Sequence, residues 1–159
     1  MPAWITIYMK SPKPVPGAVA IHDAMRLLPD WWTLGESVGL EEDEVDAFLA
    51  ELVWTETEVG QPNKRPLQFY EWTDPERVRS EIAELDEIAS IVVPDSVRAR
   101  LEGVTTVVAI EFGISQLDTM LEVVGFEIAY WLAEHHDGVI KADNGAWFDH
   151  DAHRWDPFS

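Results

Sequence analysis

The chain of 159 residues contains no cysteine, and this absence excludes several kinds of chemistry. Disulfide bonds, thiolate metal ligands and cysteine nucleophiles all require that side chain. Because 47% of the residues are hydrophobic and eight are tryptophan, the chain can instead be stabilised by the packing of an apolar core. We therefore predict a single globular domain over residues 1–159.

Long hydrophobic runs are also missing. No apolar run approaches the roughly 20 residues that cross a bilayer, and the first residues, MPAWITIYMK, lack the basic segment that precedes the apolar core of an export signal. Neither a glycine-rich phosphate loop nor a G-x-S-x-G nucleophile elbow occurs, so nucleotide and nucleophilic chemistry have no support. We expect a cytoplasmic protein that has no cofactor and does not bind membranes.

Positive charge is scarce. Eleven Lys and Arg residues stand against 30 Asp and Glu residues, which gives a formal net charge of −19. Such a chain repels phosphate backbones and attracts basic partners, so we expect no direct binding to nucleic acid. The segment GLEEDEVDAFL resembles the second helix of a helix-turn-helix in its pattern, but its acidic face would repel DNA.

The acidic residues are densest in one segment, because no Lys or Arg occurs from Leu27 through Asn63. The acids of this segment are Asp30, Glu36, Glu41, Glu42, Asp43, Glu44, Asp46, Glu51, Glu56 and Glu58. Carboxylates interleaved with aromatic side chains suit a surface that attracts a basic protein and then anchors it at a buried hot spot. We therefore predict a partner-binding site that comprises Trp31, Trp32, Glu41, Glu42, Asp43, Glu44 and Trp54. The alternative is that the tryptophans are core residues and the acids form a solvated helix end.

The segment from Thr105 to Asp149 has the clearest secondary-structure pattern. A β-branched run, Val107 to Ile110, predicts a strand buried on both faces. Ser115 can cap a helix that we expect over Leu117 to His136. The buried stripe of this helix is predicted to be Leu117, Met120, Leu121, Val124, Ile128, Trp131, Leu132 and His135. A tight hairpin turn at Asn144-Gly145, with positive φ at both residues, should then join two short strands.

The rest of the chain alternates between strand and helix patterns. We predict strands over residues 4–9, 52–59, 66–72 and 104–112, and helices over 18–28, from Leu40 onward, over 76–89 and around 97–101. The second and third of these strands should pair as a hairpin. This order predicts an α+β fold, with a mainly antiparallel sheet, helices packed on one face and crossovers that resemble the ferredoxin-like arrangement.

Four of the five histidines occur late in the chain and are the candidates for a metal site. His135 and His136 precede Asp137, and His150 and His153 flank Asp151. Neighbouring side chains on a helix point about 100° apart, so His135 and His136 do not converge easily on one ion, and no metalloenzyme signature is present. We predict no metal site and place His135 at the edge of the core. Asp143-Asn144-Gly145 fits a hairpin turn better than a calcium loop, because the other oxygen ligands of such a loop are missing.

The segment FEIAYWLAEHHDGVIKADNGAWFD, residues 126–149, resembles the carboxyl-terminal part of small bacterial proteins, some of which are grouped with the immunity proteins of polymorphic toxin systems. The shared pattern comprises Leu132, Ala133, Glu134, Asp137, Gly138, Val139, Ile140, Trp147 and Phe148. The resemblance implies a protein that neutralises a basic toxin of the same bacterium. The competing hypotheses are a metal-assisted hydrolase that uses the late His and Asp residues, and a structural or regulatory subunit.

Overall fold

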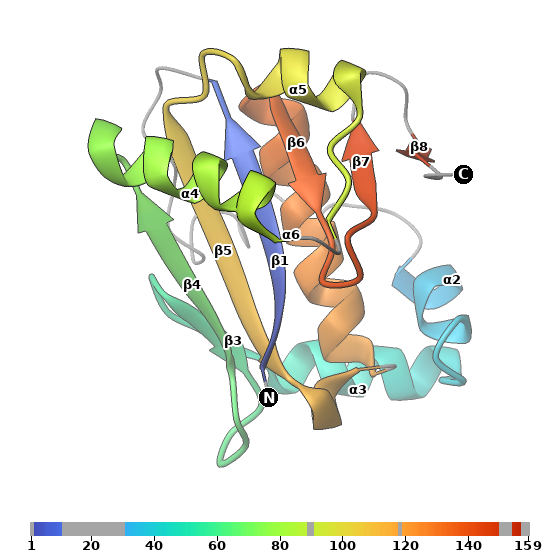
Figure 1. The fold of residues 1–159 in the computed structure, drawn as a ribbon. Helices are drawn as coiled ribbons and strands as arrows, with labels where there is room; N and C mark the ends of the chain where they lie inside the picture. Colours follow the sequence, from blue (N-terminus) through green and yellow to red (C-terminus); the bar gives the residue numbers. More distant parts are fainter. Residues whose placement is uncertain (1, 11–30, 89–90, 118, 150–153, 157–159) are drawn as a thin grey trace. The chain divides into compact units, whose positions relative to one another are not determined.

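The computed structural model describes residues 2–10, 31–88, 91–117, 119–149 and 154–156, and the helix predicted over 18–28 lies outside these ranges (Figure 1). In chain order the elements are β1 (Pro2–Met9), α2 (Trp31–Glu36), α3 (Glu42–Glu51), β2 (Val53–Trp54), β3 (Glu58–Gly60), β4 (Leu67–Trp72), α4 (Pro75–Glu87), α5 (Asp95–Leu101), β5 (Thr106–Gly113), the 3₁₀ turn η1 (Ile114–Gln116), α6 (Met120–His135), β6 (Gly138–Lys141), β7 (Trp147–Asp149) and β8 (Arg154–Asp156).

The strands form one sheet in the order β2-β3-β4-β5-β1-β6-β7-β8. The pairs β1 with β6, β2 with β3, β3 with β4, β6 with β7, and β7 with β8 are antiparallel, which confirms the predicted α+β class. The strand order does not repeat a ferredoxin-like crossover, because β4 and β5, which α4 and α5 connect, are neighbours. The connection from β5 through α6 to β6 leaves one strand, β1, between the two strands that it joins. The connection from β1 to β2 leaves three, β3, β4 and β5.

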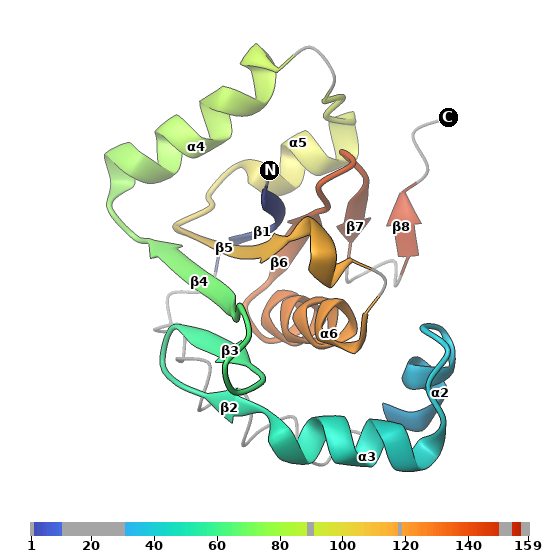
Figure 2. The same cartoon turned by 90° about the horizontal axis from the view of Figure 1, so that it is seen from below.

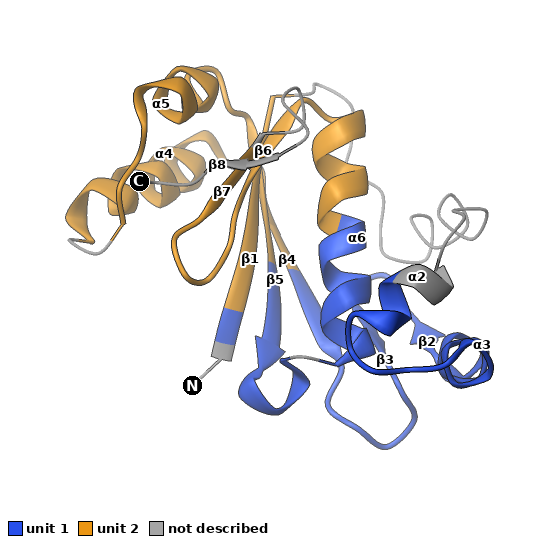
Figure 3. Cartoon of the chain, turned by 90° about the vertical axis from the view of Figure 1, so that its right-hand side faces the viewer, with its two compact units in different colours: residues 1–3, 16–69, 110–128 blue, residues 4–15, 70–109, 129–159 orange. Residues whose placement is uncertain are grey.

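The chain forms two compact units, which Figure 3 colours separately. Unit 1 comprises Met1–Ala3, Pro16–Phe69 and Ile110–Ile128, and unit 2 comprises Trp4–Val15, Tyr70–Ala109 and Ala129–Ser159. The elements β1, β4, β5 and α6 therefore contribute residues to both units. The strand β5 is buried along nearly its whole length, as its β-branched run predicts.

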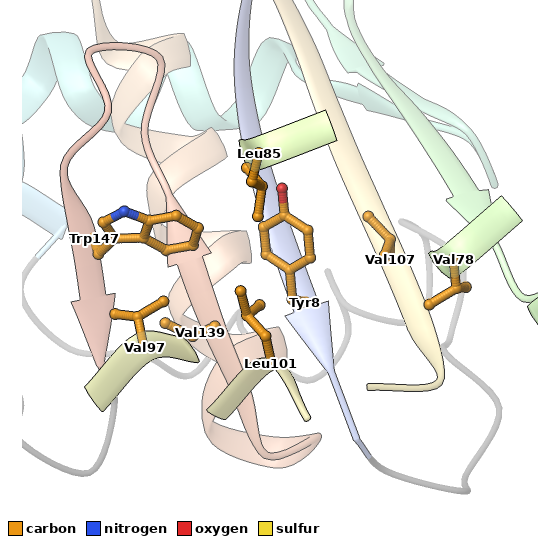
Figure 4. Packing of buried hydrophobic residues seen from close by; sticks show 8 residues of the cluster. All are labelled: Tyr8, Val78, Leu85, Val97, Leu101, Val107, Val139 and Trp147. Atoms are coloured by element: carbon orange, nitrogen blue, oxygen red, sulfur yellow. The ribbon is translucent and has the colours of Figure 1, made fainter. Parts of the chain in front are cut away.

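In unit 2, the two faces of β1 carry different side chains. Ile5, Ile7 and Met9 lie on one face, whereas Trp4, Thr6 and Tyr8 lie on the other. Tyr8 belongs to a buried cluster that draws its remaining members from the strands and from α4 and α5 (Figure 4). These members are Val78, Leu85, Val97, Leu101, Val107, Val139 and Trp147.

The opposite face of β1 is covered by the carboxyl-terminal part of α6. A Cβ atom added at Gly138 would lie 3.0 Å from Met9 Cγ, 3.1 Å from Ala133 Cα and 3.2 Å from Ile7 Cγ2. Figure 3 shows α4 and α5 on one side of the unit 2 strands and this part of α6 on the other. Placing all helices on one face is therefore wrong for unit 2. The reason is that β1 carries large side chains with apolar surface on both faces, and each face needs its own cover.

In unit 1, α2 and α3 lie side by side, and α3 leads directly into β2 (Figure 2). A side chain at Gly35 would overlap Val45 Cγ2, so the absence of a Cβ atom permits this close approach. Trp31 and Trp32, to which the sequence assigns no element, begin α2. Of the predicted α3 stripe, Val45 is fully buried, and Phe48, Leu49 and Leu52 are half-buried.

The single strand predicted over 52–59 is wrong, because a turn at Thr55–Thr57 divides it into β2 and β3. The Thr55 hydroxyl oxygen accepts the backbone N–H of Thr57 at 3.4 Å and that of Glu58 at 3.0 Å. Such a hydroxyl-centred turn competes locally with the extended conformation. β2 therefore pairs with β3, and β3 pairs with β4, so the expected hairpin partner of β4 is only the second half of the segment.

The helix predicted from Leu117 begins instead at Met120, and Ser115 lies in the 3₁₀ turn η1. The side chain of Gln116 accepts the backbone N–H of Gly113 and donates to the carbonyl of Arg65, while the Thr119 hydroxyl donates to the Gln116 carbonyl. These bonds hold the residues before Met120 in a tighter turn. Five residues of the predicted stripe are buried: Met120, Leu121, Val124, Ile128 and Leu132.

The hairpin between β6 and β7 is present, but its turn differs from the prediction. Gly145 has a φ of +86°, whereas Asn144 is not among the residues with positive φ. The Ala142 N–H donates to the Ala146 carbonyl, and the Gly145 N–H donates to the Ala142 carbonyl. This is a three-residue loop that ends in a left-handed glycine.

Replacing Gly145 with alanine should therefore lower the free energy of unfolding by about 1–2 kcal/mol, because only this position requires a left-handed conformation. Asn144→Ala should cost only about 0.5 kcal/mol, since it removes a single exposed hydrogen bond to the Ala146 N–H. Urea unfolding of both variants measures the difference. Equal losses would instead support a two-residue turn with positive φ at both positions.

Candidate functional site

Four consecutive acids begin α3 in unit 1: Glu41, Glu42, Asp43 and Glu44, called here the α3 acidic cluster. All four are exposed. Within the described ranges, no Lys or Arg forms an ion pair with any of them. The carboxylates lie at the positive end of the helix dipole, which offsets part of their mutual repulsion.

Two members of the α3 acidic cluster also hold the helix start. The Glu41 N–H donates to Glu44 Oε1 at 3.2 Å, and the Glu44 N–H donates to Asp43 Oδ1 at 3.0 Å. Both bonds use a side-chain oxygen as acceptor, and an amide oxygen of Gln or Asn can take the same place. Charge can therefore be removed from this surface without removing the caps.

The aromatic part of the predicted site is only partly described. Trp54 lies half-buried in β2 opposite Val59, and its neighbour Val53 is 53% exposed. β2 follows α3 after one residue, so the apolar strand and the acidic helix belong to one continuous segment of unit 1. The side chains of Trp31 and Trp32 lie outside the described part of the structure.

The burial of His135 and His136 is the reverse of the prediction, which placed His135 at the edge of the core. His135 is exposed; its Nδ1–H donates to the Trp131 carbonyl at 2.9 Å, and its ring stacks on the Trp131 ring at 4.3 Å. His136 is the buried one, with 5% of its surface exposed. The His136 N–H still donates to the Leu132 carbonyl at 2.9 Å, so His136 continues the i+4 row of Val124, Ile128 and Leu132 and is buried with it.

In the described ranges, no three His, Asp or Glu side chains are grouped so that they could hold a metal ion. His150, Asp151 and His153, which the hydrolase hypothesis requires, lie outside those ranges. In the same described part, no helix is long and apolar enough to span a membrane.

A pocket of about 370 Å³ lies in unit 2 between α4 and the strands, and we call it the unit 2 pocket. Its floor includes Trp4, Thr6 and Tyr8 of β1 and Lys141 of β6, which stands directly opposite Thr6 in the antiparallel register. Asp143 also lines the pocket, and its Oδ1 accepts the Trp4 N–H at 3.0 Å. The β1 face that carries polar atoms is thus the face that lines the pocket.

The wall of the unit 2 pocket is a row of α4 side chains together with Trp72 of β4. Arg77 forms an ion pair with Glu81 at 2.6 Å, and its guanidinium lies 4.8 Å from the centre of the Trp72 ring. Glu84 is exposed one turn further along α4. The pocket therefore combines aromatic surface with charged groups of both signs.

Burial affects the ionisation of two groups in the pocket. It raises the pKa of Tyr8 far above the ordinary 10.0, and the neighbouring Glu81 and Glu84 carboxylates raise it further. It lowers the pKa of Lys141, while Asp143 acts in the opposite direction. Both shifts follow from the cost of a charge that is removed from water.

The sequence contains a signal for this pocket that the prediction missed. In WITIYM, the positions of Trp4, Thr6 and Tyr8 all carry a polar atom, and the intervening positions are aliphatic. A strand covered on both sides by apolar side chains does not need such an alternation. The contribution of Lys141 and α4 could not be read in the same way, because it depends on strand order.

No protein-family model matches the chain, and no curated protein or solved structure matches it either. The resemblance of residues 126–149 to immunity-type proteins therefore remains a prediction.

The pKa shift of Tyr8 predicts a pH dependence of stability. Because the folded state keeps the proton longer than the unfolded state, the free energy of unfolding should fall as the pH rises above about 10, by up to 1.4 kcal/mol per pH unit. Tyr8→Phe should remove this part of the alkaline loss. Chemical unfolding at several alkaline pH values measures it, and phenolate absorbance of the three tyrosines should show one that ionises late. Identical alkaline slopes in both proteins would contradict the assignment.

Proposed function

We propose that the chain is a protein-binding module whose α3 acidic cluster receives a basic protein. The observation that supports this most strongly is four consecutive exposed carboxylates with no ion-pair partner among the described residues. Like charges in neighbouring helical positions repel each other, and scattered lysines would relieve that repulsion. A cationic partner would supply the missing counter-charges on binding.

The net charge of the chain and the apolar side chains of β2 favour the same function. The net charge of −19 adds a long-range attraction for cationic proteins and repels nucleic acid. The exposed Val53 and half-buried Trp54 follow α3 at the end opposite to the α3 acidic cluster, and they offer an apolar contact between the exposed Glu51 and Glu56 in the sequence. Acidic surface with an apolar centre is the composition that gives both fast association and slow dissociation.

The finer proposal is an immunity-type inhibitor that neutralises a basic bacterial toxin in the cytoplasm. Its motivation is the resemblance of residues 126–149. Toxins that act on nucleic acid need a cationic groove, and an acidic inhibitor can occupy that groove. The metal-assisted hydrolase gains no supporting observation from the described residues.

Neutralising the α3 acidic cluster should slow association. We expect Gln in place of its three glutamates, with Asn in place of Asp43, to lower the association rate roughly tenfold at low ionic strength and to flatten its salt dependence. The helix caps should survive, because both amide side chains keep an acceptor oxygen. The partner is first isolated by co-purification from the native host, and stopped-flow association at two ionic strengths then measures the rates.

A matched control separates the local surface from total charge. Substituting Glu76, Glu87 and Glu102 with Gln and Asp95 with Asn removes the same four charges from exposed positions of unit 2. This control should keep most of the association rate. Equal slowing of both stably folded variants would show that net charge alone acts, and an unchanged rate in the α3 variant would overturn the proposed site.

Trp54 should instead govern dissociation. Truncation to alanine should raise the dissociation rate roughly 30-fold, equivalent to about 2 kcal/mol, because a half-buried aromatic beside a charged rim is a typical hot spot. Trp54→Phe should retain most of the residence time, and Tyr70→Ala on β4 serves as the control aromatic. A folded Trp54→Ala variant with an unaltered dissociation rate would place the anchor elsewhere.

A further inference from the structure

The floor of the unit 2 pocket contains hydroxyl groups without partners. Tyr8 is 3% exposed and Thr6 is 8% exposed, yet neither hydroxyl forms a hydrogen bond with any part of the chain that the structure describes. Figure 4 shows the Tyr8 hydroxyl beside Leu85, and both residues line the pocket. Neither oxygen is among the fully buried, unpartnered side-chain atoms of the described residues, so both hydroxyls are open to the pocket and can bond to a bound molecule.

Lys141 provides a positive charge on the same floor. The residue is half-buried, and no carboxylate of a described residue lies within ion-pairing distance of its ammonium group. Removing a charge from water is costly unless an opposite charge compensates for it. Asp143 supplies part of that compensation from a distance, although one of its oxygens accepts the Trp4 N–H, and an anionic group of a bound molecule could pair with the ammonium group directly.

Glu84 provides a negative charge on the wall. Arg77 already neutralises Glu81 at 2.6 Å, whereas Glu84 has no ion pair within the described part of the chain. The pocket thus presents a cation on the sheet and a carboxylate on α4, and neither forms an ion pair with another described residue. A molecule with a single charge would satisfy only one of them, and a neutral sugar would satisfy neither.

The remaining surface is aromatic and of limited size. Trp4 and Trp72 line the pocket, and the Trp4 ring lies 5.7 Å from the Tyr70 ring. The volume of about 370 Å³ is near the lower end of the range for small-molecule sites. Both features suit a compact molecule with an apolar body.

From this combination we propose that the unit 2 pocket binds a free α-amino acid with a large apolar side chain. Lys141 pairs with its carboxylate, Glu84 pairs with its ammonium group, and its side chain lies against Trp4 and Trp72. The Tyr8 and Thr6 hydroxyls bond to its polar atoms. This site belongs to unit 2 and is independent of the α3 acidic cluster, so either proposal can fail without the other.

Calorimetric titration of the full chain with three related molecules tests the proposal. Phenylalanine should bind, whereas phenylalanine amide, which lacks the carboxylate, and N-acetylphenylalanine, which lacks the ammonium group, should each bind at least tenfold more weakly. Lys141→Met should weaken phenylalanine about tenfold and leave the amide unchanged. Glu84→Gln should weaken phenylalanine and the amide but leave the N-acetyl compound unchanged.

Two variants outside the pocket serve as controls, Lys64→Met in unit 1 and Glu87→Gln on α4, and both should bind phenylalanine as the unaltered chain does. Unfolding midpoints show whether each variant is folded. Because Glu84 is exposed, Glu84→Gln should not disturb folding, so it still tests the proposal if Lys141→Met proves unstable. The proposal is overturned if neither phenylalanine nor leucine binds at millimolar concentration, if glucose binds instead, or if the two derivatives bind as well as phenylalanine.

Discussion

The burial of β1 on both faces is the constraint on which unit 2 depends. The strand lies between β5 and β6 in the sheet, so neither of its edges is open. Its aliphatic face requires the carboxyl-terminal part of α6 as cover, and its other face requires α4 and α5. Because Tyr8 and Thr6 bring polar atoms to that second face, its cover is incomplete there, and the unit 2 pocket occupies the space that remains.

Charge is distributed differently in the two units. In unit 1, the acids at the start of α3 stand without described counter-charges and face water. In unit 2, several carboxylates pair with arginine, as Asp86 does with Arg98 at 2.7 Å and Asp137 with Arg100 at 2.9 Å. Surface pairs of this kind add little stability, but they reduce the local negative field. The acidic character that would attract a basic protein is therefore strongest where arginine is missing from the sequence.

The elements with a long or uniform pattern were predictable from the sequence. The β-branched run of β5 and the apolar stripe of α6 repeat over enough residues that their local pattern agrees with their tertiary environment. The errors lie where one side chain changes the backbone locally. The Thr55 hydroxyl turns a predicted strand into two, Gln116 delays the start of α6, and Gly145 alone takes the left-handed position that was assigned to two residues.

The two candidate sites also differ in how far the sequence predicts them. The α3 acidic cluster was predictable, because exposure of consecutive acids at a helix start follows from composition and helix geometry. The unit 2 pocket was not, because it joins residues of β1, α4 and β6 that lie far apart in the sequence. His135 and His136 illustrate how sensitive such assignments are, since a shift of one residue decides which histidine follows Ile128 and Leu132 at i+4 spacing on the buried face of α6.

The position of β1 in the sheet also determines when the strand finds its partners during synthesis. Thr6 to Met9 pair with Lys141 to Gly138, and the Thr105 N–H donates to the Met9 carbonyl. A ribosome must therefore translate most of the chain before this apolar strand can be covered. Until then, Ile5, Ile7 and Met9 are exposed on the nascent chain. Chaperones bind exposed hydrophobic segments of this kind. Folding of unit 2 is consequently a late event that awaits the residues of β6.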